Sequence, residues 1–161
     1  MSNLRIGLGE HSPLTIAGGP LRLGGVDIPH DFRLAGHSDA DALLHAVIDA
    51  LLGAAGLPDI GELFPNTDAA HRGQDSGELL GIVARRVADA GYAVVNLDCV
   101  VSAESPKLSP HKEAIRSRLA DLLQIPAEQV NVKAKTGEGL GPVGQGELIE
   151  ARCAALLEKV N

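Results

Sequence analysis

The chain has 161 residues, 45% of them hydrophobic, which suits a single globular domain over residues 1–161. Its 14 lysine and arginine residues against 21 aspartate and glutamate residues give a net charge of −7, and aromatic residues make up only 2%. These values argue against a nucleic-acid partner, because phosphate binding needs a basic face and base stacking needs aromatic rings.

Strand and helix signals alternate along the chain. Strands are predicted near residues 4–8, 21–28, 92–101, 130–134 and 147–157, and helices near 38–55, 75–90 and 109–123. Gly24-Gly25 marks the turn of a hairpin, and Ser38 or Asp39 is the expected cap of the first helix. The order of elements predicts an α+β fold in which a mixed β-sheet carries helices packed on one face.

The two cysteines, Cys99 and Cys153, lie in apolar strand-like runs, so we expect buried thiols rather than zinc ligands. No segment reaches the roughly 18 apolar residues of a membrane span, and the N-terminus has no apolar signal core. We therefore expect a cytoplasmic protein with no membrane partner.

Histidine and aspartate recur through the predicted first helix. Asp41, His45 and Asp49 fall at positions i, i+4 and i+8, along one side of a helix. Such groups can share a divalent metal, or a carboxylate can fix the tautomer of an imidazole. The alternative is a capped, solvated helix face.

Four further polar runs occur at predicted strand ends and in loops: Gly9–Ser12, Pro58–Asp68, Ala103–Lys107 and Lys133–Gly141. Each alone could be an ordinary turn. The last run combines lysines, a threonine and glycines, which suits phosphate binding, although the Walker pattern is absent. Together these runs indicate metal-assisted phosphoryl chemistry on a small diphosphate.

A family resemblance covers almost the whole chain in order. It is carried by Arg5–Gly9, Gly24–Pro29, His37–Ala46, Asp49–Ala55, Asp59–Gly61, Leu63–Asp68, Ser76–Leu80, Pro106–Lys107 and Asn131–Ala134. These segments closely resemble the 2-C-methyl-D-erythritol 2,4-cyclodiphosphate synthases of non-mevalonate isoprenoid precursor synthesis.

The resemblance implies a homotrimer with active sites between neighbouring subunits. Its substrate would be a small-molecule cytidine diphosphate, 4-diphosphocytidyl-2-C-methyl-D-erythritol 2-phosphate, which cyclises with release of CMP. It also implies a zinc-type ion on one side of the phosphates and a magnesium or manganese ion at the diphosphate.

The resemblance also implies roles for individual residues. The catalytic set is Ser38, Asp49, Lys107 and Thr136, with Asp49 expected to orient His45. His45 matches a ligand of the first metal and Glu138 the ligand of the second, and a small local shift would let His11 join His45. The substrate-binding set is His37, Asp59, Ile60, Gly61, Phe64, Asn66, Asp68, Ala103, Pro106, Lys135 and Glu138.

The chain departs from the family's usual Gly-x-Asp-x-His zinc motif. Its ungapped match places His11 at the aspartate position and Pro13 at the histidine position. Asn66, Pro142 and Gln145 are further departures. Two interpretations follow: an active synthase with an altered zinc site, or a silent or repurposed trimeric homologue that keeps the nucleotide pocket. An unrelated metal-dependent phosphoesterase is a third.

Overall fold

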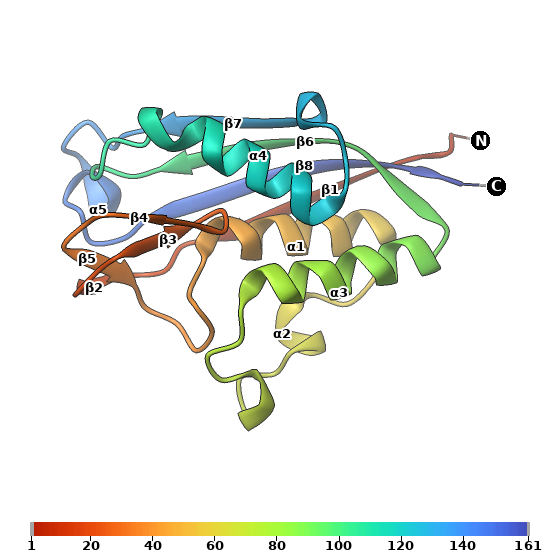
Figure 1. Cartoon of the computed structure of the whole chain (residues 1–161), viewed down its shortest axis with the longest axis horizontal. Coiled ribbons are helices and arrows are strands. Elements are labelled where there is room, and N and C mark those ends of the chain that lie inside the picture. Colours follow the sequence, from red (N-terminus) through yellow and green to blue (C-terminus); the bar gives the residue numbers. More distant parts are fainter. Residues whose placement is uncertain (1, 161) are drawn as a thin grey trace.

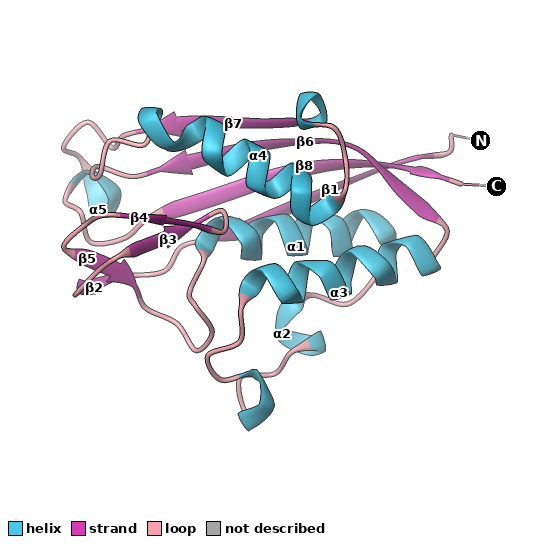
Figure 2. Ribbon diagram, in the orientation of Figure 1, coloured by secondary structure: helices cyan, strands magenta, loops and turns pink. Residues whose placement is uncertain are grey.

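The structure, a computed structural model that describes residues 2–160, is built on a four-stranded sheet with the strand order β1-β8-β6-β7 (Figures 1 and 2). The sheet is mixed, because β8 runs antiparallel to both β1 and β6 whereas β6 and β7 are parallel. Its strands are β1 (Leu4–His11), β6 (Tyr92–Ser102), β7 (Val130–Lys135) and β8 (Glu150–Lys159).

Three helices cover one face of this sheet. Helix α1 (Ala42–Ala55) packs on β1 and β8, α4 (Lys112–Leu123) packs on β7, and α3 (Ser76–Asp89) lies beside α1 (Figure 1). The predicted α+β fold, with a mixed sheet and helices on one face, is confirmed.

Short elements complete the chain. They are β2 (Thr15–Ala17), β3 (Leu21–Leu23), β4 (Val26–Ile28), β5 (Phe32–Leu34), α2 (Ile60–Leu63), α5 (Gly141–Gly144) and the 3₁₀ turns Ala69–His71, Ser109–His111 and Ala127–Gln129. The predicted hairpin is β3–β4, with Gly24 and Gly25 both at positive φ. The predicted C-terminal strand at 147–157 forms β8, and the 3₁₀ turn at 109–111 leads directly into α4.

Strand β1 turns its glycines, not its leucines, toward the helices. A Cβ atom on Gly9 would lie 1.9 Å from the Ala46 carbonyl oxygen of α1, so only glycine permits this approach. Ile6 and Leu8 point away from the core and are 78% and 65% exposed. The run from Gly9 to His11 belongs to β1, not to a turn after it as predicted.

Asp41, not Ser38 or Asp39, caps α1. Its side chain is fully buried and accepts hydrogen bonds from the backbone N–H groups of Gly24, Gly25 and Leu44. Burial raises the pKa of this carboxyl group, against the effect of those three donors. Asp41 therefore fastens the β3–β4 turn to α1. Its helical spacing suggested a polar site shared with His45, but the Asp41 side chain does not take part in one.

Both cysteines are buried, free thiols, as expected. They occupy directly opposite positions on the neighbouring strands β6 and β8. Within residues 2–160, no helix has both the length and the apolar composition that a membrane span needs.

Candidate active site

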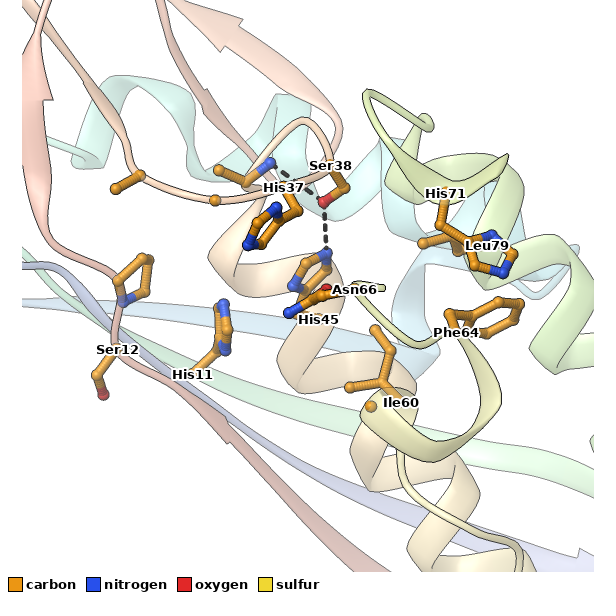
Figure 3. Close-up of a pocket in the computed structure, with 15 residues that line it drawn as sticks. His11, Ser12, His37, Ser38, His45, Ile60, Phe64, Asn66, His71 and Leu79 are labelled. Carbon is orange, nitrogen blue, oxygen red and sulfur yellow. Dashed lines mark hydrogen bonds between the residues drawn. The ribbon is translucent and has the colours of Figure 1, made fainter. Parts of the chain in front are cut away.

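A cavity of about 450 Å³ opens between the start of α1, the end of β1 and the segment around α2 (Figure 3). We call it the histidine pocket. It brings together many of the predicted site residues: His11, His37, Ser38, His45, Ile60, Gly61, Phe64 and Asn66.

His11 and His45 face each other across this pocket. His11 is the last residue of β1, His45 lies near the start of α1, and their ring centroids are 4.8 Å apart (Figure 3). The close approach of β1 to α1 at Gly9 brings the two rings to this separation. Two imidazoles at such a distance can offer nitrogen ligands to one cation.

Burial keeps both rings neutral. It lowers the pKa of His45 to about 4, with a further lowering from His11 and an opposing effect of the Asp39 charge. Burial also lowers the pKa of His11, against the effect of Asp49. At neutral pH each ring therefore keeps a lone pair, which metal binding requires.

Two serine hydroxyls contact one nitrogen of His45. Its Nε2 lies 3.2 Å from Ser38 Oγ and 3.0 Å from Ser76 Oγ. Ser76 lies at the start of α3 and is fully buried, and its hydroxyl donates to Asp39 Oδ1. Asp39 in turn pairs with Arg22.

The other predicted aspartates organise the segment between α1 and α3. Asp49 Oδ1 accepts the Ile60 N–H at 2.8 Å, so Asp49 holds this loop. The expectation that Asp49 orients His45 is not met, because Asp49 forms this hydrogen bond instead of one to His45. Burial raises the pKa of Asp49, against the lowering effect of that N–H. Asp59 caps α2, and Asp68 caps the next turn and lies 3.5 Å from His71 Nε2.

A second cluster of predicted residues lies at the ends of the parallel strands β6 and β7. The Ala103 N–H donates to the Lys135 carbonyl, and the Gly137 N–H donates to Glu104 Oε2 at 3.0 Å. We call residues 103–107 and 135–138 the loop pair. It contains Ala103, Pro106, Lys107, Lys135, Thr136 and Glu138, none of which lines the histidine pocket.

The donor set of the histidine pocket fits a cation only in part. His11 and His45 supply two nitrogens, and Pro13 lies on the pocket wall without a ligating atom. No group of three or more histidine, cysteine, aspartate or glutamate side chains with metal-binding geometry occurs within residues 2–160. Oxygen atoms of a substrate or of water would have to complete a tetrahedral site.

Several residues of the pocket were not predicted from the sequence. Leu79 and His71 line it, and His71 packs edge-to-face on Phe64 with centroids 5.4 Å apart. Ser76, which contacts His45, was not predicted as a site residue, because a serine at the start of a helix is indistinguishable in sequence from an ordinary cap.

The model of the YgbB family matches residues 4–158 of this chain. The chain belongs to the YgbB family. It is 50% identical over 155 residues to a 2-C-methyl-D-erythritol 2,4-cyclodiphosphate synthase of Rhodopirellula baltica, covering 96% of this chain and 93% of that one. The same name belongs to a Burkholderia cenocepacia relative, 53% identical over 157 residues and 98% of each chain. The structure of a Plasmodium falciparum IspF in complex with CDP superposes with a TM-score of 0.87, at 32% identity over 100% of this chain and 99% of that one.

Proposed function

We propose that this protein is a 2-C-methyl-D-erythritol 2,4-cyclodiphosphate synthase. The observation that carries the proposal is the histidine pocket, where two neutral imidazoles and the Ser38 hydroxyl surround a cavity of about 450 Å³. Relatives that carry this enzyme name match over nearly the full chain at about half of all positions, which supports it.

The reaction joins two phosphates of one substrate. An oxygen of the 2-phosphate attacks the β-phosphorus of the diphosphate, and the bond from that phosphorus to the bridging oxygen breaks as CMP leaves. The protein has to hold two mutually repelling phosphates in line, so catalysis consists mainly of positioning and charge neutralisation. No protein nucleophile is needed.

In this assignment the histidine pocket holds the erythritol and phosphate end. His37 and Ser38 contact the sugar alcohol and phosphate from the loop before α1. The segment from Asp59 to Asp68 contributes Ile60, Gly61, Phe64 and Asn66 to the pocket wall. Asp49 acts through this segment, since it fixes the Ile60 N–H.

His11 and His45 would hold a zinc-type cation, and phosphate oxygens of the substrate would supply the remaining ligands. Bound there, it supplies Lewis-acid polarisation of the phosphate that it contacts. With two protein nitrogens instead of the three protein ligands of most catalytic zinc sites, we expect weaker binding in the absence of substrate.

The loop pair is assigned to the cytidine diphosphate end. Ala103 and Pro106 would contact the nucleoside. The ammonium groups of Lys107 and Lys135 and the hydroxyl of Thr136 would contact the phosphates. Glu138 would hold a magnesium or manganese ion beside the diphosphate. The ends of adjacent parallel strands are a common location for phosphate-binding loops.

The separation of these two clusters supports a homotrimer. Residues of the loop pair are absent from the pocket lining, and Figure 1 places the ends of β6 and β7 away from α2. A complete site then needs the histidine pocket of one subunit and the loop pair of the next. The exposed apolar residues Leu4, Ile6 and Leu8 on β1 are suited to an interface between subunits.

Phosphorus NMR tests the proposal directly. Purified protein is incubated with the cytidine diphosphate substrate and magnesium, with and without zinc, and we expect CMP and a cyclic diphosphate to appear together. Lys107→Ala should lower kcat by about 10³-fold, whereas Lys159→Ala, which removes an exposed lysine at the far end of β8, should leave kcat unchanged. CDP binding without turnover would instead support a silent homologue, and the absence of both would overturn the proposal.

A further inference from the structure

A continuous series of polar contacts links an arginine on β3 to His45. Arg22 Nε lies 3.2 Å from Asp39 Oδ2, and Asp39 Oδ1 accepts the hydroxyl of Ser76. Asp39 Oδ2 also accepts the Ser76 backbone N–H at 2.9 Å, so the carboxylate forms hydrogen bonds with both the backbone and the side chain of Ser76. The contact from Ser76 Oγ to His45 Nε2, at 3.0 Å, completes the series.

The direction of the protons follows from this arrangement. A carboxylate only accepts hydrogen bonds, so the single hydroxyl proton of Ser76 is committed to Asp39. Ser76 Oγ can then only accept from His45, which requires a proton on Nε2. An unprotonated Nε2 would set two lone pairs against each other at 3.0 Å inside a buried site.

A proton on Nε2 has two consequences inside the histidine pocket. The other ring nitrogen, Nδ1, keeps its lone pair and has no hydrogen bond to another group within residues 2–160. Ser38 Oγ accepts from the Ala40 N–H at 3.3 Å and lies 3.2 Å from the same protonated Nε2. The hydroxyl proton of Ser38 is then free to point at a ligand in the cavity (Figure 3).

We propose that Arg22, Asp39 and Ser76 form a positioning relay that sets the Nε2–H tautomer of His45. The relay leaves His45 Nδ1 available to a divalent cation and leaves the Ser38 hydroxyl available to a phosphate oxygen. These three residues are positioning residues, because they act through His45 and Ser38. The inference rests on the proposed function only in naming what the two freed groups bind.

Nitrogen NMR of the metal-free protein tests the relay without any substrate. With ¹⁵N-labelled histidine at neutral pH, the protonated and unprotonated ring nitrogens give well-separated signals. We expect His45 to show a protonated Nε2 and an unprotonated Nδ1. A protonated Nδ1 in the wild-type protein would overturn the proposal, whatever the enzyme's activity.

Substitutions at Ser76 then test the cause. Ser76→Ala removes the acceptor, so the His45 signals should shift toward a tautomer mixture, and Zn²⁺ affinity measured by calorimetry should fall about 10- to 100-fold. Ser76→Thr keeps a hydroxyl at the same position and should restore both readouts. The matched control is Ser117→Ala, at an exposed serine on α4.

Asp39→Asn makes the sharpest prediction. Two donors, Arg22 Nε and the Ser76 N–H, face Asp39 Oδ2, whereas Oδ1 faces Ser76 Oγ and one backbone donor, the Asp41 N–H at 3.2 Å. The carbonyl oxygen of the new amide should therefore take the Oδ2 position, at the loss of the Asp41 contact, and its NH₂ group would donate to Ser76 Oγ. The Ser76 hydroxyl would then donate to His45 Nε2 and force the Nδ1–H tautomer. A wrong tautomer of this kind can disable a histidine without changing its geometry.

The outcomes separate the relay from the proposed activity. A wild-type Nε2–H tautomer that survives both Ser76→Ala and Asp39→Asn would show that the relay does not set it. A relay that behaves as expected in a protein without cyclodiphosphate synthesis would leave the relay standing and remove the proposed function.

Discussion

The histidine pocket and the loop pair are built in opposite ways. In the pocket, partly buried side chains are held by specific contacts: His45 by two hydroxyls and Asp49 by a backbone N–H. In the loop pair, Lys107, Lys135 and Thr136 are exposed. Its hydrogen bonds serve mainly to order the backbone.

This difference indicates how the work is divided. Neutral imidazoles with fixed orientation are suited to hold a cation, and burial creates them. Exposed ammonium and hydroxyl groups are suited to bind an anionic ligand, but the loop pair does not line the histidine pocket that could enclose such a ligand. Each cluster therefore provides what the other lacks, which agrees with the proposal that one site is formed by two subunits of a trimer.

Mixing two inactive variants would test this relation with the largest effect. His45→Ala and Lys107→Ala should each lower kcat by about 10³-fold, as loss of a group that stabilises the transition state does. A trimer reassembled from equal amounts of both should regain about one quarter of the wild-type rate, because random assembly pairs an intact pocket with an intact loop pair at that frequency. The rate is measured after joint unfolding and refolding.

Each variant refolded alone is the control for that experiment. Recovery no greater than the sum of the two single variants would show that the pocket and the loop pair of one chain serve the same site. The comparison between the two regions would then lose its functional meaning.

The pocket, unlike the loop pair, depends on the contact of β1 with α1. Gly9→Ala would place a Cβ 1.9 Å from the Ala46 carbonyl oxygen and should lower the free energy of unfolding by about 3 kcal/mol or more. The control is Gly53→Ala in α1, where no atom beyond the adjoining residues and the helix's own backbone lies within 4 Å of the added Cβ. It should stabilise the protein by about 0.5–1 kcal/mol. Urea unfolding measures both, and equal effects would contradict the packing argument.

The neutrality of His45 makes stability depend on pH. Its pKa is lowered to about 4 in the folded protein from an ordinary value of 6.5, so the unfolded chain binds the proton first as the pH falls. Stability should be complete above pH 6.5 and decline toward pH 4, by about 3 kcal/mol from this group. Urea unfolding of metal-free protein across this range measures the loss.

His45→Gln isolates the histidine contribution to that pH dependence. The difference in unfolding free energy between the variant and the wild type should shrink as the pH falls from 6.5 to 4. A constant difference would show that His45 is as easily protonated in the folded protein as in the unfolded chain.

Much of the fold could be predicted because its signals are local. The hairpin at Gly24-Gly25, the start of α3 and the β-branched run of β6 each depend on a few adjacent residues, whereas the helix predicted from residue 109 begins with a 3₁₀ turn and becomes α4 at Lys112. Strand β1 shows the limit of such reasoning. Its alternating residues predicted a strand correctly. The helices nevertheless cover the glycine face of this strand and leave its leucine and isoleucine side chains exposed, because α1 packs closely on Gly9.

Site residues that belong to a sequence motif could be predicted, whereas hydrogen-bond partners that depend on how the helices pack could not. Family resemblance placed Ser38 and His45 at one site, with His11 in the position of a usual ligand, and the structure brings all three to one cavity. The sequence did not reveal that Asp49 would bind Ile60 or that Ser76 would reach His45 over 31 positions. Those contacts arise from the packing of α1 against α2 and α3.

The departure at positions 11 and 13 gives the smallest expected effect and the most direct test of where the cation binds. Pro13 lies on the wall of the histidine pocket, next to the strand end that carries His11. The double substitution His11→Asp with Pro13→His replaces the His11 nitrogen with an anionic oxygen ligand and adds one nitrogen ligand, so three protein ligands, including His45, take the place of two. Zn²⁺ affinity of the substrate-free protein should rise about tenfold or more, as measured by calorimetric titration.

The single substitution Pro13→Ala separates ligand chemistry from backbone freedom. It removes the proline ring and adds no ligand, so it should leave Zn²⁺ affinity unchanged. If the double substitution also left affinity unchanged in a folded protein, the cation would not bind between β1 and α1. The loop pair, with Glu138, would then be the better place to seek it, and the division of work between the two regions would be reversed.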